Sequence, residues 1–210
     1  MTGGDGNDYL DFRKTAGATY GNGLEGNSLV GGYGADTIIV NEADMMDTNS
    51  NARNFKIFGD KDGGTADAPI YSGANGGVNY YANFYVDELK IYAKDASTVT
   101  PGSTVVSMNL FKYINQIDRV EKIDISADSV KTEFFLSVAL IQGLADNANN
   151  SAIVLKLKKN FDSYKIDTTG GYTLSTSPAS PQPQINGSDT QSLVFKSGAT
   201  TVATAYIEYV

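Results

Sequence analysis

The sequence predicts a mainly β protein: a short parallel β-roll at the N-terminus, followed by a β-sandwich-like module with one short helix near residues 128–145. Three observations lead to this prediction. Glycine-rich turns alternate with short apolar runs between residues 3 and 39. Further along the chain, apolar and polar residues alternate with the period of two that is typical of half-buried strands. Hydrophobic residues make up 41% of the 210 residues, which is enough to form a core, and only 19% are charged.

The N-terminal prediction depends on two copies of one template, G-G-x-G-x-D-x-(large apolar)-x, at residues 3–11 and 31–39, which start 28 residues apart. Residues 21–30 form a degenerate third copy. Glycine permits tight turns that expose carbonyl oxygens, and the aspartate adds a carboxylate beside them. Calcium takes six to eight such oxygens at roughly 2.3–2.6 Å. The candidate calcium ligands are therefore Gly4, Gly6, Asp8, Gly32, Gly34 and Asp36.

This template is the calcium-binding nonapeptide of RTX proteins, and the chain resembles that family of secreted bacterial proteins with hemolysin-type repeats. The resemblance implies a β-roll with calcium in its turns and with Leu10 and Ile38 pointing inward. In such a roll, turns on one side stack about 18 residues apart, so Asp8 is expected to face residues 21–23. The resemblance also implies type I secretion through a C-terminal signal, and we expect residues 3–39 to be the last turns of a longer roll.

The composition excludes several classes of function. The net charge of −8 and the pI of about 4.5 argue against binding to nucleic acid or to anionic membrane surfaces. The chain contains no cysteine and no histidine, which removes disulfides, thiol catalysis, serine–histidine triads and zincin sites. No apolar run reaches the length of a membrane span. We therefore expect neither an enzyme nor a membrane-spanning protein.

The sequence predicts two domains, residues 1–40 and residues 41–210, with a further possible boundary near residue 114. In the second domain, Asp60 and Asp62 alternate ahead of glycine as in the start of a calcium loop, but the EF-hand pattern is not completed. These two residues are candidate metal ligands, with a solvated turn as the alternative. Tyrosine-rich residues 80–92 predict strands, because residues 86–92 alternate apolar and polar side chains.

Residues 120–125 (VEKIDI) are similar to a strand found near the C-terminus of large RTX adhesins and surface-layer proteins. In those proteins such a strand precedes a short amphipathic helix and a last β-module. Here Asp128 or Ser129 can cap a helix that continues through Phe134 and Phe135 to Leu144. After it, residues 153–158 predict a strand, residues 175–188 an exposed loop, and residues 192–210 a final hairpin.

Together these patterns predict a calcium-binding structural module of a secreted RTX surface protein, either an adhesin or a surface-layer protein, that folds on Ca²⁺ outside the cell. Its expected partners are calcium and either surface glycans or other copies of the parent protein. Two alternatives stay open. One is a lectin-like module in which the tyrosines of residues 80–92 stack on sugar. The other is the accessory C-terminal domain of a secreted RTX enzyme.

Overall fold

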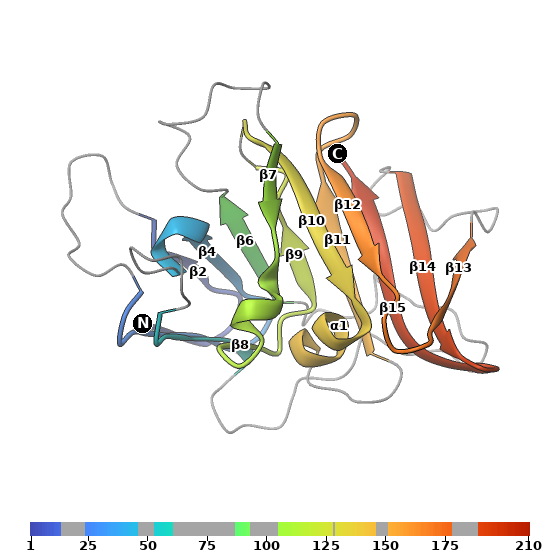
Figure 1. Ribbon diagram of the computed structural model, residues 1–210. Helices are drawn as coiled ribbons and strands as arrows, with labels where there is room; N and C mark the ends of the chain where they lie inside the picture. The colour runs from blue at the N-terminus through green and yellow to red at the C-terminus, as the bar shows by residue number, and fades with distance from the viewer. Residues whose placement is uncertain are drawn as a thin grey trace.

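The predicted mainly β class is confirmed in the computed structural model, which describes residues 1–13, 24–45, 53–60, 87–92, 105–127, 129–145, 151–177 and 189–210. Within these residues the strands form three sheets, accompanied by one α-helix and two 3-10 turns (Figure 1). None of the helices in this part of the chain is both long and apolar enough to cross a membrane.

The first two sheets are built from strands that arrive in alternation along the chain. The first sheet is entirely parallel and contains, in spatial order, β1 (Thr2–Asp5), β3 (Ser28–Tyr33), β5 (Lys56–Asp60) and β8 (Ile117–Asp118). The second begins with the parallel strands β2 (Tyr9–Asp11), β4 (Thr37–Asn41), β6 (Glu88–Tyr92), β9 (Lys122–Asp124) and β11 (Ser151–Leu157). It continues through β15 (Thr200–Tyr209), parallel to β11, and ends with the antiparallel strands β14 (Asp189–Ser197) and β13 (Thr173–Ser177).

The third sheet is also parallel and consists of β7 (Val105–Met108), β10 (Lys131–Ser137) and β12 (Ser163–Asp167). The chain visits the sheets in a fixed order: β5, β6 and β7 are followed by β8, β9 and β10. Each such round is one coil of a parallel solenoid, stacked on the coil before it. The 3-10 turns η1 (Glu42–Met45) and η2 (Leu110–Tyr113) and the helix α1 (Val138–Leu144) lie between strands of successive sheets.

One aliphatic row shows how the coils share a core. The strand register of the second sheet places one inward-facing residue from each of six strands side by side, and all six are buried: Leu10, Ile38, Leu89, Ile123, Leu155 and Ile207. Each member lies beside its counterparts in the adjacent coils, so the core grows by stacking, as in repeat proteins. The expected inward orientation of Leu10 and Ile38 is confirmed.

The stacking period differs from the predicted one. Gly4 pairs with Gly32, and Tyr9 pairs with Thr37, so equivalent positions lie 28 residues apart instead of about 18. The predicted 18-residue stacking is therefore wrong for these strands, and the backbone N–H of Asp8 donates instead to Asp36. Residues 21–23, which the sequence predicts Asp8 to face, belong to the segment 14–23 that lies outside the described part of the chain. The two complete glycine–aspartate copies occupy the same corner of adjacent coils.

The predicted helix near residues 128–145 is correct only in its second half. Residues 131–137 form β10, in which Thr132, Phe134 and Leu136 are buried while the residues between them are partly exposed. Burial that alternates with a period of two is typical of a strand, and the prediction of one continuous helix did not take this alternation into account. The helix begins at Val138, and its N-cap is Ser137, whose hydroxyl accepts a hydrogen bond from the Leu140 backbone N–H at 3.1 Å.

After residue 40 the pairing is mostly parallel, unlike the antiparallel pairing of the predicted β-sandwich-like module. Among the described strands, antiparallel pairing is limited to β13 with β14 and β14 with β15. The predicted strand at residues 153–158 and the predicted final hairpin are present as β11 and as β14–β15. Strands from both sides of residue 40, where the sequence predicts a domain boundary, share the first two sheets.

Candidate functional site: a column of carboxylates at one corner

The corner between the first and second sheets carries one acidic residue in each of four successive coils. Each residue directly precedes a strand of the second sheet, and we refer to the set as the corner column: Asp8, Asp36, Asp87 and Glu121. Because the strands that follow are in register, the four residues lie above one another along the stack.

The corner column is held together by hydrogen bonds between coils. Asp36 Oδ1 accepts from the backbone N–H of Asp8 at 2.8 Å, and Asp87 Oδ1 accepts from the N–H of Asp36 at 2.8 Å. Glu121 Oε2 accepts in the same way from the N–H of Asp87 at 2.9 Å. Each carboxylate therefore caps the turn of the preceding coil, in the way a carboxylate satisfies an otherwise unpaired backbone donor.

A glycine beside each of three column members makes room for the carboxylate. A Cβ on Gly31 would lie 2.3 Å from Asp36 Oδ2 and 2.2 Å from the carbonyl oxygen of Gly59 in the next coil. A Cβ on Gly59 would similarly lie 2.4 Å from Asp87 Oδ2. The first glycine of each G-G pair is thus explained by close packing between coils. Gly4, Gly6, Gly32 and Gly34 in addition adopt positive φ angles, which favour glycine, and a Cβ on Gly32 or Gly34 would also collide with a backbone carbonyl of the preceding coil.

The predicted metal ligands fall into two groups. The first group lies at adjacent levels of this corner: Gly4, Gly6, Asp8, Gly32, Gly34 and Asp36. Of the second group, Asp60 belongs to β5 and its backbone pairs with Gly32, but its side chain is outside the described atoms, as is all of Asp62. The structure therefore brings the template residues together and leaves the second predicted site without a description.

Asp87 and Glu121 complete the corner column, and the sequence reasoning missed both. The signal that could have found them is an acidic residue two places before a buried aliphatic one. Asp87 has this spacing to Leu89, and Glu121 has it to Ile123, as Asp8 has it to Leu10. The signal was hidden because the register offset between Thr37 and Glu88 is 51 residues instead of 28.

The chemical type of these donors fits calcium, which binds oxygen ligands almost exclusively. Asp8 Oδ2 is buried and has no hydrogen-bond partner among the described atoms. The column nevertheless spreads its carboxylates along a line, and the described residues contain no group of three or more acidic side chains arranged to hold one ion. A calcium ion here would have to complete its shell with backbone carbonyls and water.

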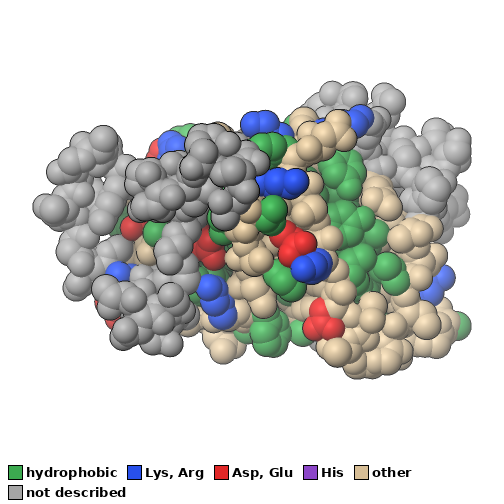
Figure 2. Space-filling model, turned by 45° about the horizontal axis from the view of Figure 1, so that its top comes forward, with side chains coloured by type: hydrophobic (Ala, Val, Ile, Leu, Met, Phe, Trp, Pro, Cys, Tyr) green, Lys and Arg blue, Asp and Glu red, His purple; other side chains and the backbone are tan. Residues whose placement is uncertain are grey.

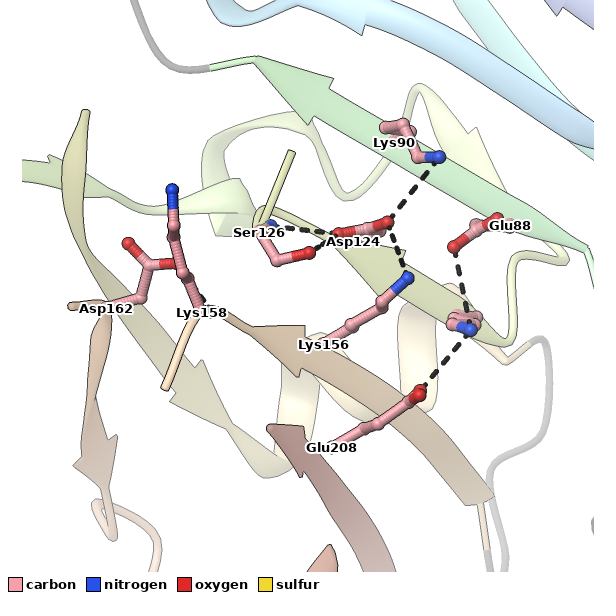
Figure 3. A network of polar contacts seen from close by, with 9 residues as sticks. Glu88, Lys90, Asp124, Ser126, Lys156, Lys158, Asp162 and Glu208 are labelled. Carbon is pink, nitrogen blue, oxygen red and sulfur yellow. Dashed lines mark hydrogen bonds and ion pairs between the residues drawn. The ribbon is translucent and has the colours of Figure 1, made fainter. Parts of the chain in front are cut away.

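A second polar cluster lies on the second sheet, shown in Figure 3. Asp124 on β9 is 1% exposed and lies between two lysines of the neighbouring strands, Lys90 at 3.6 Å and Lys156 at 3.3 Å. Ser126 donates to Asp124 Oδ1 through its backbone N–H at 2.9 Å and through its hydroxyl at 2.7 Å. Burial acts to raise the pKa of Asp124, but the hydrogen bonds from Ser126 and the charge of Lys156 outweigh it and lower that pKa below its usual value.

A second group of ion pairs, centred on Lys122, lies beside Asp124. Lys122 Nζ lies 3.6 Å from Glu88 Oε1 and 3.3 Å from Glu208 Oε2. Opposite charges on adjacent strands stabilise the pairing of a sheet. The ion pairs of Lys122 and those of Asp124 together link β6, β9, β11 and β15. On the face shown in Figure 2, acidic and basic side chains are interleaved and do not gather into a patch of one sign. We interpret the cluster as structural.

Comparison of the chain with protein families, with curated proteins and with solved structures finds no match. The function of the chain is therefore inferred from its own residues, above all from those of the corner column.

Proposed function

We propose that the chain is a calcium-stabilised structural module of a secreted bacterial surface protein, of the adhesin or surface-layer kind. The observation that carries this proposal is the corner column, in which acidic side chains follow one another in adjacent coils. The RTX-like template at residues 3–11 and 31–39 supports the assignment to secreted proteins.

The electrostatics of the corner column explain why a cation would stabilise it. Neighbouring parallel strands lie about 4.8 Å apart. Two carboxylates at that separation repel each other by roughly 3 kcal/mol at an effective dielectric constant of about 20. The hydrogen bond that Asp36, Asp87 and Glu121 each accept from a backbone N–H offsets about 1.5–3 kcal/mol. The two terms are of similar size, so a divalent cation beside the column would shift the balance clearly toward the stacked coils.

Calcium binding would then be linked to folding. An ion that binds only the stacked coils stabilises them by mass action, by about 2.7 kcal/mol at a hundredfold excess over its dissociation constant. Calcium is scarce in the cytoplasm and abundant outside the cell. The chain would therefore be less stable during export and gain stability at the surface, which suits a module that is built into a large extracellular protein.

The test is thermal unfolding followed by circular dichroism, in excess calcium, in chelator and in magnesium. For a chain of this size, 2.7 kcal/mol corresponds to a rise in Tm of about 5–11 °C. We expect that rise with calcium only, and we expect Asp36→Ala to reduce it. Asp5→Ala is the matched control, because Asp5 ends β1, one coil before Asp36, and is exposed and outside the corner column.

Two outcomes would overturn the proposal. An unchanged Tm in calcium would show that the column serves only as a set of hydrogen-bond acceptors. An equal rise in magnesium and calcium, preserved in Asp36→Ala, would show that the effect arises from general screening of the negative charge. Either result would also remove the support that the template gives to secretion.

A further inference from the structure

A pocket of about 380 Å³ lies where η2, the ends of β10 and β12, and the start of α1 come together. In Figure 1 β10 and β12 both run toward α1, and none of the residues that line the pocket belongs to the corner column. Three aromatic rings line the pocket beside polar side chains, and its described lining includes Asn109, Phe111, Phe135, Ser137, Gln142, Asp167, Thr169, Gly170 and Tyr172.

The aromatic rings are presented to the pocket by the local backbone. Phe135 lies between the buried Phe134 and Leu136 on β10, so the alternation of the strand turns its ring away from the core. Phe111 is 50% exposed, which is unusual for a phenylalanine and leaves much of its ring accessible to a ligand. Tyr172 packs over Gly170, where a Cβ would come within 2.8 Å of the ring.

The polar groups around the rings are fixed in position and keep hydrogen-bonding capacity. Asp167 Oδ1 accepts from the backbone N–H of Thr169 at 2.9 Å and from its hydroxyl at 2.7 Å, which leaves Oδ2 as an exposed acceptor. Asn109 Oδ1 accepts from the N–H of Phe111 at 3.0 Å, so its amide NH₂ can donate elsewhere. The Ser137 hydroxyl accepts from Leu140 and retains its own proton as a donor.

The charge of the lining selects the class of ligand. Among the lining residues Asp167 is the sole charged group. Lys165, whose Nζ lies 5.6 Å from the centroid of the Phe135 ring, is not part of the lining and is paired with Glu133 at 2.8 Å, so the lining itself offers no cation to a phosphate or carboxylate. The volume lies at the lower end of the range for small-molecule sites, about 300–1,000 Å³. Aromatic faces attract the slightly positive C–H groups of a sugar ring, while amide, hydroxyl and carboxylate groups match its hydroxyls.

We propose that this pocket binds a neutral sugar, one or two rings in size, such as the end of a surface glycan. The site is separate from the tyrosine-rich residues 80–92 that the sequence suggested for sugar binding, most of which lie outside the described residues. It is also independent of calcium at the corner column, so either proposal can fail without the other.

The experiment is a titration of the full chain with simple ligands, followed by amide chemical shifts in NMR. The probes are neutral methyl glycosides and disaccharides, a methyl glucuronide as the anionic probe, and tetramethylammonium as the cationic probe. We expect saturable shifts with at least one neutral sugar at millimolar concentration, the ordinary range for a small site of this kind. The anionic probe should bind more weakly than its neutral counterpart.

Substitutions of lining residues test whether the sugar binds in this pocket. Tyr172→Ala and Phe111→Ala should each weaken binding by about tenfold or more. Phe111→Ala should leave Tm unchanged, because this side chain is 50% exposed, whereas Tyr172 also packs against the hydrophobic core and its replacement should lower Tm slightly. Tyr33→Ala is the matched control, because Tyr33 is 43% exposed and does not line the pocket. No saturable shift with any sugar up to about 50 mM would overturn the proposal. Binding of tetramethylammonium alone, or equal loss in the Tyr33 variant, would overturn it as well.

Discussion

Replacement of Gly31 by alanine tests the central claim about how the coils stack. The added Cβ would lie 2.2 Å from the Gly59 carbonyl oxygen and 2.3 Å from Asp36 Oδ2. Carbon–oxygen contacts require about 3 Å or more, so the backbone of the next coil or the buried carboxylate must move by most of an ångström. The side chain of Asp36 cannot swing away freely, because its Oδ1 holds the Asp8 N–H.

The expected loss of unfolding free energy in Gly31→Ala has two components. Overpacking at a rigid contact costs about 1–3 kcal/mol, and a buried N–H that loses its acceptor costs about 1–3 kcal/mol. We expect Gly31→Ala to lower the free energy of unfolding by about 3 kcal/mol, which is roughly 6–12 °C in Tm for a chain of this length. Urea unfolding followed by circular dichroism measures the free energy directly.

Gly198→Ala provides the matched control. Gly198 lies in the turn between β14 and β15 with a φ of +61°, and nothing lies within 4 Å of the position of an added Cβ. Its replacement should cost only the strain of a left-handed alanine, about 1–2 kcal/mol. If Gly31→Ala were no more costly than Gly198→Ala, the close packing of glycine against the corner column would be refuted.

Two further predictions concern titratable groups. Asp124→Ala should cost about 3 kcal/mol, because it leaves Lys90 and Lys156 without their shared carboxylate in a largely buried setting. The wild-type protein should lose this contribution as the pH falls below about 4, since the pKa of Asp124 is lowered in the folded state and stability is lost as the carboxylate is protonated. Burial raises the pKa of Tyr206 and of Tyr209 to about 12, so stability should fall as the pH rises from about 10 to about 12. Tyr206→Phe should reduce that alkaline loss, and an unchanged pH profile in either variant would contradict the assignment.

The sequence predicts the local features of this fold better than their spacing. The template correctly places Leu10 and Ile38 in the core and Gly6 and Gly34 in bends with positive φ, because both follow from short-range chemistry, whereas its G-G pairs lie within β1 and β3. The 18-residue period came from the assumption of a two-sided roll. The offset between successive strands of the second sheet is instead 28, 51 and 34 residues, and a strand of the third sheet, β7, lies within the last of these intervals. Because insertions of different length separate the coils, equivalent positions do not recur at a constant spacing in the sequence.

The region from 131 to 144 shows a second limit of sequence reasoning. Phe134, Val138 and Ile141 have the spacing of a helical face, yet Thr132, Phe134 and Leu136 alternate as in a strand. The two patterns overlap at Phe134, and the choice between them is made by parallel partners on both sides, β7 and β12, which are distant in sequence. Tertiary pairing therefore overrides the local propensity in the first half, and the Ser137 cap permits a helix only in the second.

The corner column also determines what kind of calcium response is to be expected. Asp36, Asp87 and Glu121 already accept hydrogen bonds from backbone N–H groups of the preceding coil, and the aliphatic row behind them is buried by its neighbours in the stack. Removal of calcium should therefore lower the Tm but leave the β-sheet signal intact at room temperature, unlike small metal-dependent domains that unfold on chelation. A complete loss of that signal in chelator would mean that repulsion along the column exceeds what its hydrogen bonds and the core can offset. The estimated 3 kcal/mol per neighbouring pair would then be too small.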